Sequence, residues 1–353
     1  MFFLSPLPLR ILLALFTAFF CAALVTPSVA SLARRIKAVD LPGEERRVHS
    51  RATPRLGGLA ILLGCFTAAL SFTAPRADLA GVMRAALLIA LMGFLDDCFS
   101  LRSPLKLVFQ LLAAVMAWRS GARIELLRVP LNGGGFVPLG ALSLPLTAVW
   151  LTACTNAMNL IDGLDGLAAG VAAIASLSML LVAAAVSEGE IAVLLAALAG
   201  GCLGFLPYNR SPARIFMGDT GSQTLGFLLG AAAILGLFKT HVILTFLVPP
   251  LALGLPLADT AFAFLRRTLR GQNPMRPDRG HIHHRLLSLG LGQKKTVALL
   301  YGVSALLGLL AVALTEKGDA ARAVAALTLT AAGAALLSLI RKRIGLSRRG
   351  SAL

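Results

Sequence analysis

Four polar side chains recur at three-residue intervals between two long apolar runs: Asn156, Asn159, Asp162 and Asp165. On a helix, residues three apart share one face, although the line they form drifts around the axis. Amide and carboxylate oxygens are ligands for hard divalent cations, and they also form hydrogen bonds with a sugar or a base. The spacing therefore predicts a binding site here. A helix cap explains four such residues poorly.

Two other stretches place carboxylates where apolar runs begin or end. Asp96 and Asp97 are adjacent, so their charges repel unless a cation lies between them, which suits a metal ion or a proton acceptor. A cap for the following turn is the alternative. Asp219 precedes an apolar run and is either its N-cap or a ligand for Mg²⁺, which binds one or two protein acids and keeps several waters.

Basic and amide side chains lie in the same polar stretches. Three of the five histidines cluster within residues 266–295, without the spacing of a helical zinc pair and without a nearby cysteine, so phosphate is the better ligand. The basic loop near residues 34–55 is interpreted either as part of the site or as a positively charged anchor at the cytoplasmic membrane surface. The candidate residues in these stretches are His281, His283, His284, Arg285, His49, Arg55, Lys106 and Asn209.

Acids that hold a divalent cation, together with basic side chains, are typical of phosphoryl transfer, in which positioning and charge neutralisation supply most of the catalysis. The predicted substrate is a charged phosphate compound of the cytoplasm, and its co-substrate lies in the bilayer.

The elements that must position these residues are membrane helices. The 353 residues are 57% hydrophobic and 14% charged, with a mean hydropathy of +0.83, whereas soluble domains carry about 25% charged residues. A membrane-spanning helix needs roughly 20 mostly apolar residues, and apolar runs of about that length recur along the chain. We predict one all-α polytopic domain over residues 1–353, with eleven spans near 9–33, 56–74, 80–95, 104–119, 138–158, 166–186, 190–206, 220–237, 241–265, 296–315 and 320–340.

Charge sets the orientation of these spans. Most of the 33 Lys and Arg residues fall in alternate loops, which predicts that those loops are cytoplasmic, with the N-terminus outside and the C-terminus inside. The polar stretches near 34–55, 96–106, 156–166, 207–222 and 266–295 then share the cytoplasmic face. The net charge of +17 suits anionic membrane lipids or an anionic substrate. Nucleic acid is not an expected partner, because no soluble module with interleaved aromatic residues is present.

Four motifs, taken in order, resemble the polyprenyl-phosphate N-acetylhexosamine-1-phosphate transferase family: LDDCFSLRSPLK, NAMNLIDGLDGLAAG, NRSPARIFMGDTGS and PDRGHIHHRL. The last looks like the bacterial WecA/TagO branch. The resemblance implies transfer of GlcNAc-1-phosphate from UDP-GlcNAc to undecaprenyl phosphate, with release of UMP, at the bacterial inner membrane. This is the first membrane step of cell-envelope polysaccharide synthesis. It also implies Mg²⁺ as cofactor, with Mn²⁺ as the alternative ion, and leaves a homodimer open.

The resemblance also implies roles for the residues. Asp219, Asn159 and Asp97 would lie at the metal, Asp96 would take a proton from the lipid phosphate, and Lys106 would neutralise phosphate. The nucleotide and sugar would be lined by Asn156, Asp162 and Asp165, and covered by His281, His283, His284 and Arg285. His49 and Arg55 match a basic first loop.

Three alternatives stay open at this point. The second pKa of a phosphate monoester is near 6, so a base adds little at neutral pH, and Asp96 is alternatively a partner of the metal or of Lys106. The donor is alternatively UDP-GalNAc, a modified hexosamine or UDP-MurNAc-pentapeptide. A lipid or anion transporter is the non-enzyme alternative, although transporters place such residues near the bilayer midplane rather than at one face.

Overall fold

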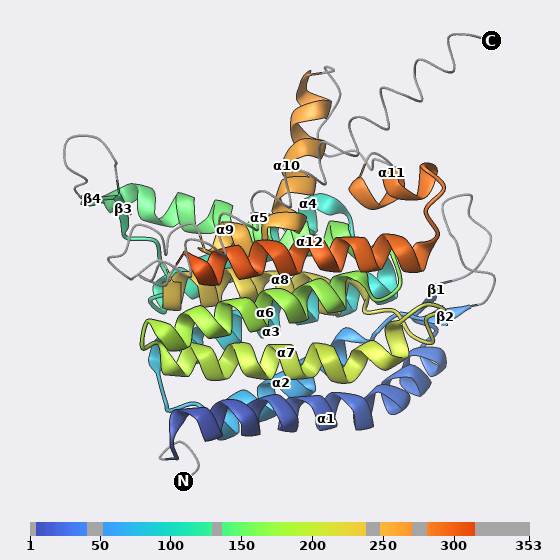
Figure 1. Cartoon of the computed structure of the whole chain (residues 1–353), viewed down its shortest axis with the longest axis horizontal. Helices are drawn as coiled ribbons and strands as arrows, with labels where there is room; N and C mark the ends of the chain where they lie inside the picture. The colour runs from blue at the N-terminus through green and yellow to red at the C-terminus, as the bar shows by residue number, and fades with distance from the viewer. Residues whose placement is uncertain (1–4, 41–51, 129–135, 238–247, 270–280, 315–353) are drawn as a thin grey trace.

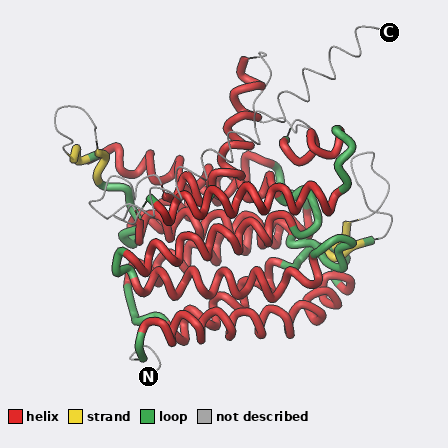
Figure 2. The backbone as a smooth tube through the Cα atoms, in the orientation of Figure 1, coloured by secondary structure: helices red, strands yellow, loops and turns green. Residues whose placement is uncertain are grey.

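The computed structural model describes residues 5–40, 52–128, 136–237, 248–269 and 281–314. Within them the chain is almost entirely helical (Figures 1 and 2). The helices are α1 (Leu7–Arg35), α2 (Gly58–Phe72), α3 (Ala77–Phe99), α4 (Ser103–Arg119), α5 (Ser143–Ile161), α6 (Leu167–Ala185), α7 (Gly189–Asn209), α8 (Gly218–Ala232), α9 (Val248–Ala252), α10 (Gly254–Leu269), α11 (Ile282–Ser288) and α12 (Gln293–Ala313). A 3-10 turn (Gly140–Leu142) precedes α5, and a π-helical turn (Ala233–Leu237) continues α8.

The prediction of an all-α membrane protein is confirmed. By length and composition, six helices of the described ranges could cross a membrane: α1, α3, α5 with its 3-10 turn, α6, α7 and α12. The helices α2, α4 and α8 also match predicted spans but are shorter. The predicted span 320–340 lies outside the described residues.

The predicted span 241–265 differs from the structure. Its described part is two helices, α9 and α10, separated by a turn at Leu253. Pro249, Pro250 and Pro256 cannot donate to a continuous helical ladder, which accounts for the break. Helix α10 then rises out of the bundle in Figure 1 instead of lying along its neighbours.

Small residues let the long helices approach closely, as is usual between membrane helices. Helix α1 turns Ala14, Ala18 and Ala22 inward, and all three are fully buried. A Cβ atom on Gly200 of α7 would lie 2.1 Å from the carbonyl oxygen of Leu15, so no larger residue fits there. Figure 1 shows α1, α7, α6 and α12 running side by side.

Two short antiparallel strand pairs connect the helices. One is β3 (Leu126–Arg128) with β4 (Phe136–Pro138), which lies between α4 and α5. The other, β1 (Val39–Asp40) with β2 (Thr53–Pro54), was not predicted. The Phe216 N–H donates to the Pro54 carbonyl at 2.7 Å, so this second pair is tied to the segment before α8. It therefore helps to position the start of α8.

Candidate active site

The carboxylate of Asp219, at the start of α8, is held by three other side chains from three helices. Its Oδ2 accepts hydrogen bonds from Lys106 Nζ at 2.8 Å and from Gln223 Nε2 at 2.7 Å. Its Oδ1 accepts from Asn159 Nδ2 at 3.0 Å. The same amide reaches Ser222 Oγ at 3.0 Å. Helices α4, α5 and α8 thus meet at this one carboxylate.

Lys106 also binds Asp96, near the end of α3. Its Nζ lies 2.5 Å from Asp96 Oδ2, so one ammonium group joins two carboxylates. Asp96 Oδ1 accepts the Leu101 N–H at 2.7 Å. Both oxygens of Asp96 are therefore engaged, and accepting a proton would weaken its bond to Lys106. The geometry favours Asp96 as the partner that positions Lys106.

Asp97 caps helix α8 from outside it. Its Oδ1 accepts the Asp219 N–H at 2.9 Å, and its Oδ2 accepts the Thr220 N–H at 3.0 Å and the Thr220 hydroxyl at 2.7 Å. A carboxylate at a helix N-terminus satisfies free N–H groups and complements the helix dipole. Asp97 therefore fixes the helix that carries Asp219, a role that the sequence did not predict.

Two glycines allow α3, which carries Asp97, to approach the start of α8 closely. Gly218 has φ +74°, a left-handed conformation that favours glycine. A Cβ atom there would lie 2.5 Å from Asp97 Oδ2. On α3, a Cβ on Gly93 would lie 2.6 Å from the Asp219 carbonyl oxygen, so α3 and α8 touch through backbone.

The predicted residue Arg55 lies at the rim of the cluster. Its Nε is 3.5 Å from Asp97 Oδ1, and its Nη1 is 3.6 Å from Asp40 Oδ1. Arg55 therefore adds positive charge beside the carboxylates of Asp97 and Asp40, without a short hydrogen-bonded ion pair to either.

A chain of amides lies behind the cluster. Asn156 Nδ2 donates to Gln110 Oε1 at 2.8 Å, and Gln110 Nε2 donates to Gln223 Oε1 at 2.9 Å. Because Gln223 also binds Asp219, Asn156 supports the site through two intermediates. Asn156 is not part of the cavity lining.

A cavity of about 280 Å³ opens onto the cluster. Asp162, in the turn between α5 and α6, lines it, and its carboxylate has no hydrogen-bond partner among the described residues. Burial, with the nearby charges of Asp219, Asp97 and Asp165, raises the pKa of Asp162 well above its usual range. A cation or a hydrogen-bond donor in the cavity would relieve this repulsion. Its other polar lining residues are Asp40, Arg55, Asp97, Asn159, Asp165, Asn209, Asp219 and His284.

Asp165 and Asn209 serve mainly to join two turns at the cavity wall. Asn209 Oδ1 accepts the Gly166 N–H at 3.1 Å, and its Nδ2 donates to the Ile215 carbonyl at 2.9 Å. Asp165 Oδ2 accepts the Ala213 N–H at 3.0 Å. These bonds hold the α5–α6 turn against the segment that precedes α8, so both residues shape the cavity.

The histidine segment packs onto the same turn. His281 Nδ1 lies 3.0 Å from Asp259 Oδ2, and the Ile282 N–H donates to Asp259 Oδ1 at 2.8 Å, so α10 anchors the start of α11. His283 is buried against Gly163, where a Cβ atom would lie 2.5 Å from its Nε2. Burial and the neighbouring His284 lower the pKa of His283 to about 4, which leaves it neutral at pH 7.

The histidines therefore divide by position. His284 lines the carboxylate cavity, whereas His281 and His283 hold the segment in place. Arg285 is exposed and is not among the cavity-lining residues. His49 falls within residues 41–51, outside the described ranges.

The oxygen donors at the cavity fit Mg²⁺ in kind. Asp219, Asp162 and the amide of Asn159 all line it. Among the residues that the structure describes, no group of three or more His, Cys, Asp or Glu side chains could enclose a metal. Mg²⁺ rarely needs such a cage, because it binds one or two carboxylates and takes its other ligands from phosphate and water.

Sequence reasoning missed several residues of this site. Gln223 and Ser222 follow Asp219 by four and three residues on α8, and Gln110 follows Lys106 by four on α4. Helical spacing alone could have indicated all three. Asp259 stands alone in an apolar stretch, and an isolated acid of that kind is usually functional.

The comparison with known proteins points to the part of the chain that carries this cluster. A family model described as Glycosyl transferase family 4 matches residues 79–237, which contain every helix that contributes to the Asp219 cluster. A Bacillus subtilis (strain 168) protein named "probable undecaprenyl-phosphate N-acetylglucosaminyl 1-phosphate transferase" is 39% identical over 311 residues, covering 87% of this chain and 85% of that protein.

Two further relatives carry different names. A decaprenyl-phosphate N-acetylglucosaminephosphotransferase of Mycolicibacterium smegmatis is 35% identical over 327 residues, covering 84% of this chain and 80% of that protein. A phospho-N-acetylmuramoyl-pentapeptide-transferase of Moorella thermoacetica is 35% identical over 238 residues, covering 61% and 73%. The first two named relatives thus match nearly the whole chain, and the third matches less of it.

Proposed function

Because the chain belongs to the polyprenyl-phosphate N-acetylhexosamine-1-phosphate transferase family, we propose that it transfers GlcNAc-1-phosphate from UDP-GlcNAc to undecaprenyl phosphate. A phosphate oxygen of the lipid attacks the β-phosphorus of UDP-GlcNAc. The bond from that phosphorus to the bridging oxygen breaks, and UMP leaves. The names of the Bacillus and Mycolicibacterium relatives, which both join N-acetylglucosamine phosphate to a polyprenyl phosphate, support this donor and this class of acceptor.

The observation that carries the proposal is the Asp219 cluster. Lys106, Asn159 and Gln223 converge on one carboxylate at the edge of a cavity. Preorganised charges and dipoles are what phosphoryl transfer needs, since its transition state spreads negative charge over phosphate oxygens. Lys106 can meet that charge at the cost of one of its two carboxylate contacts.

The acceptor phosphate does not require a strong base. Its second pKa is near 6, so much of it is already a dianion at pH 7. In this proposal Asp96 orients Lys106, and His284 with Arg55 meets the diphosphate at the cavity rim.

Mg²⁺, with Mn²⁺ as the alternative, would be held by Asp219, Asp162 and the Asn159 amide oxygen. When bound, it would neutralise the diphosphate and polarise its oxygens. Asp97 would keep the Asp219 end of α8 in place by capping it.

The proposal includes a location. The carboxylate cavity faces the cytoplasm of a bacterium, with the protein in the inner membrane, the N-terminus outside and the C-terminus inside. The basic loops at the carboxylate end of the bundle support this orientation.

Another UDP-sugar is the second candidate donor. The Moorella relative, named for a muramoyl-pentapeptide, supports the same chemistry with a different sugar. His284 and Arg55 line the cavity and would meet the diphosphate of either donor.

The test is a donor panel. Purified protein is incubated with undecaprenyl phosphate, Mg²⁺ and, in separate reactions, UDP-GlcNAc, UDP-GalNAc, UDP-MurNAc-pentapeptide or UDP-glucose, and UMP release is measured. We expect release with UDP-GlcNAc above all others. Release with only one other sugar would retain the chemistry and reject the donor, whereas no release with any sugar would reject the enzyme.

A further inference from the structure

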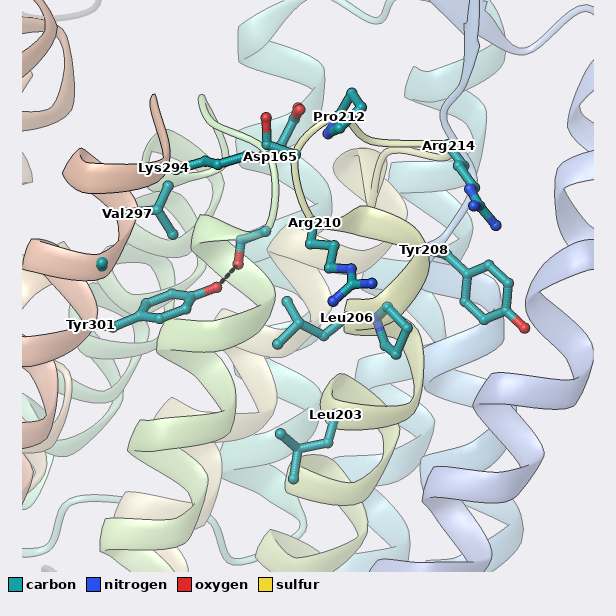
Figure 3. A pocket seen from close by; sticks show the side chains of 14 residues that line it. Asp165, Leu203, Leu206, Tyr208, Arg210, Pro212, Arg214, Lys294, Val297 and Tyr301 are labelled. Carbon is teal, nitrogen blue, oxygen red and sulfur yellow. Dashed lines mark hydrogen bonds between the residues drawn. The ribbon is translucent and has the colours of Figure 1, made fainter. Parts of the chain in front are cut away.

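A second and larger cavity lies beside the carboxylate site. Its volume is about 970 Å³, against about 280 Å³ for the carboxylate cavity, and the two share only Asp165. The end of α7, the segment that follows it and the first half of α12 form its walls (Figure 3). A volume near the upper end of the range for ligand pockets is large enough for part of a lipid.

The deep part of this groove is apolar. Leu203 and Leu206 project from α7, and Val297 projects from α12 (Figure 3). The ring of Tyr301 closes the side toward α6, because its hydroxyl donates to the Gly166 carbonyl at 2.5 Å. The wall is therefore fixed, and it matches a hydrocarbon chain rather than a sugar.

The outer part of the groove is cationic. Arg210, Arg214 and Lys294 line it, and all three are exposed. Within the described ranges, none of their side chains has a hydrogen bond or an ion pair. The one acid in the lining, Asp165, accepts the Ala213 N–H at 3.0 Å through its Oδ2.

We propose that this groove binds an anionic phospholipid of the adjoining membrane leaflet. The phosphate lies at Arg210, while Arg214 and Lys294, which Figure 3 shows on either side of it, add positive charge along the rim, and one acyl chain lies along the apolar wall. Guanidinium groups bind phosphate through paired hydrogen bonds, and basic pockets between membrane helices bind anionic head groups. The proposal goes beyond the transferase activity and does not depend on it.

The occupant is not the acceptor lipid of the transfer reaction. An acceptor phosphate must reach the cavity that Asp219 lines, and none of the three cations lines that cavity. The Asn209–Gly166 and Asp165–Ala213 bonds build the wall between the two spaces. A phospholipid held in the groove therefore does not react, and it braces α7 against α12.

Binding of spin-labelled phosphatidylglycerol to the full chain in phosphatidylcholine nanodiscs tests this proposal. We expect the combined Arg210→Gln, Arg214→Gln and Lys294→Gln variant to bind about 100-fold more weakly, since each basic residue near anionic lipid contributes about fivefold. The matched control is Arg34→Gln, Arg35→Gln and Lys295→Gln, which removes three exposed charges outside the groove lining. Equal losses in the two variants would overturn the site.

A second variant tests whether the lipid contacts the apolar wall of the groove or is attracted only by the surface charge. Ala298 lines the cavity and is exposed, so Ala298→Phe fills apolar space while every cation remains. We expect this variant to weaken phosphatidylglycerol binding as well, and unchanged binding would contradict the acyl-chain contact. Competition by undecaprenyl phosphate at matched concentration would assign the groove to the acceptor lipid, and competition by glycerol 3-phosphate would reduce it to a phosphate site. Either result overturns the proposal.

Discussion

The two ends of the helix bundle differ in how their carboxylates are paired with basic side chains. At the end away from the cavity, Arg10 pairs with Glu190 at 2.8 Å, and Arg76 pairs with Asp78 at 2.7 Å and Glu188 at 3.2 Å. Each of these three acids is paired with an arginine. At the other end, Asp96 and Asp219 share the single ammonium group of Lys106.

One end therefore holds salt bridges that stabilise the fold, and the other end holds the candidate active site. Glu190 also accepts the Ala74 N–H at 2.6 Å, so its pair closes the joint between α1, α7 and the α2–α3 turn. In the part of the chain that the structure describes, one ammonium group serves both Asp96 and Asp219, and a cavity opens beside them. Carboxylates that share one cation beside a cavity are where a metal and a phosphate substrate would bind. Changes at the two ends should therefore act on different quantities.

The largest effect is expected from Asp219→Asn. This substitution keeps the shape of the side chain but removes the charge on which Lys106, Asn159 and Gln223 converge. We expect kcat to fall about 10³-fold, the upper range for loss of one preorganised electrostatic group. The measurement is UMP release at saturating substrates and Mg²⁺, with folding checked by the thermal transition. Near-normal turnover would remove Asp219 from the reaction.

Lys106→Gln should follow in size. It deletes the cation shared by Asp96 and Asp219, and we expect kcat to fall about 100-fold. Lys295→Gln, an exposed lysine at the same end, is the matched control and should leave turnover unchanged. A similar loss in both variants would mean that general surface charge, not the shared ammonium, supports the reaction.

Gly218→Ala should move α8 without removing a charge. A Cβ atom would press on Asp97 Oδ2, and the φ of +74° adds strain of about 1–3 kcal/mol. We expect both a lower thermal transition and a lower kcat. Gly290→Ala is the control, because Gly290 has φ +83° and a Cβ atom there would meet nothing within 4 Å. If Gly290→Ala lowers kcat equally, backbone strain alone explains the loss.

Asp96→Asn distinguishes a positioning residue from a base. We expect a loss of about tenfold, below the roughly 10²–10⁴-fold that loss of an acid–base group costs, because Lys106 is only held less firmly. The pH profile of kcat should keep its shape. A rate that recovers at high pH would instead show that Asp96 accepts the acceptor's proton.

Glu190→Gln should have the smallest effect on turnover. It breaks the Arg10 pair, which is largely buried, and we expect a loss of stability of about 1–2 kcal/mol after allowing for partial exposure. The thermal transition should fall while kcat stays unchanged. A fall in kcat at full folding would show that the two ends are coupled.

The sequence predicted the membrane helices and the clustering of the polar stretches well, for a physical reason. Carboxylates and amides are costly beside apolar runs, so each one stands out, and their positions at span ends bring them together. The break between α9 and α10 did not follow from hydropathy, because Pro249, Pro250 and Pro256 lie within one continuous apolar run.

The division of labour within the site could not be read from spacing. Asp96 and Asp97 are adjacent, yet one binds Lys106 and the other caps α8, because successive residues on α3 face different neighbours. Asn209 looked like a phosphate contact but joins two turns. These roles depend on where α8 begins in space, which only the packing of α3 against α8 determines.

The most direct test follows the β-phosphorus itself. UDP-GlcNAc labelled with ³²P at the β-phosphate is incubated with undecaprenyl phosphate and either the unaltered protein or Asp219→Asn, and the lipid fraction is extracted and counted. We predict that the label and GlcNAc enter the lipid in equal amounts, and that Asp219→Asn slows the entry of both about 10³-fold. Label left in the aqueous phase while GlcNAc enters the lipid would contradict transfer of a sugar phosphate.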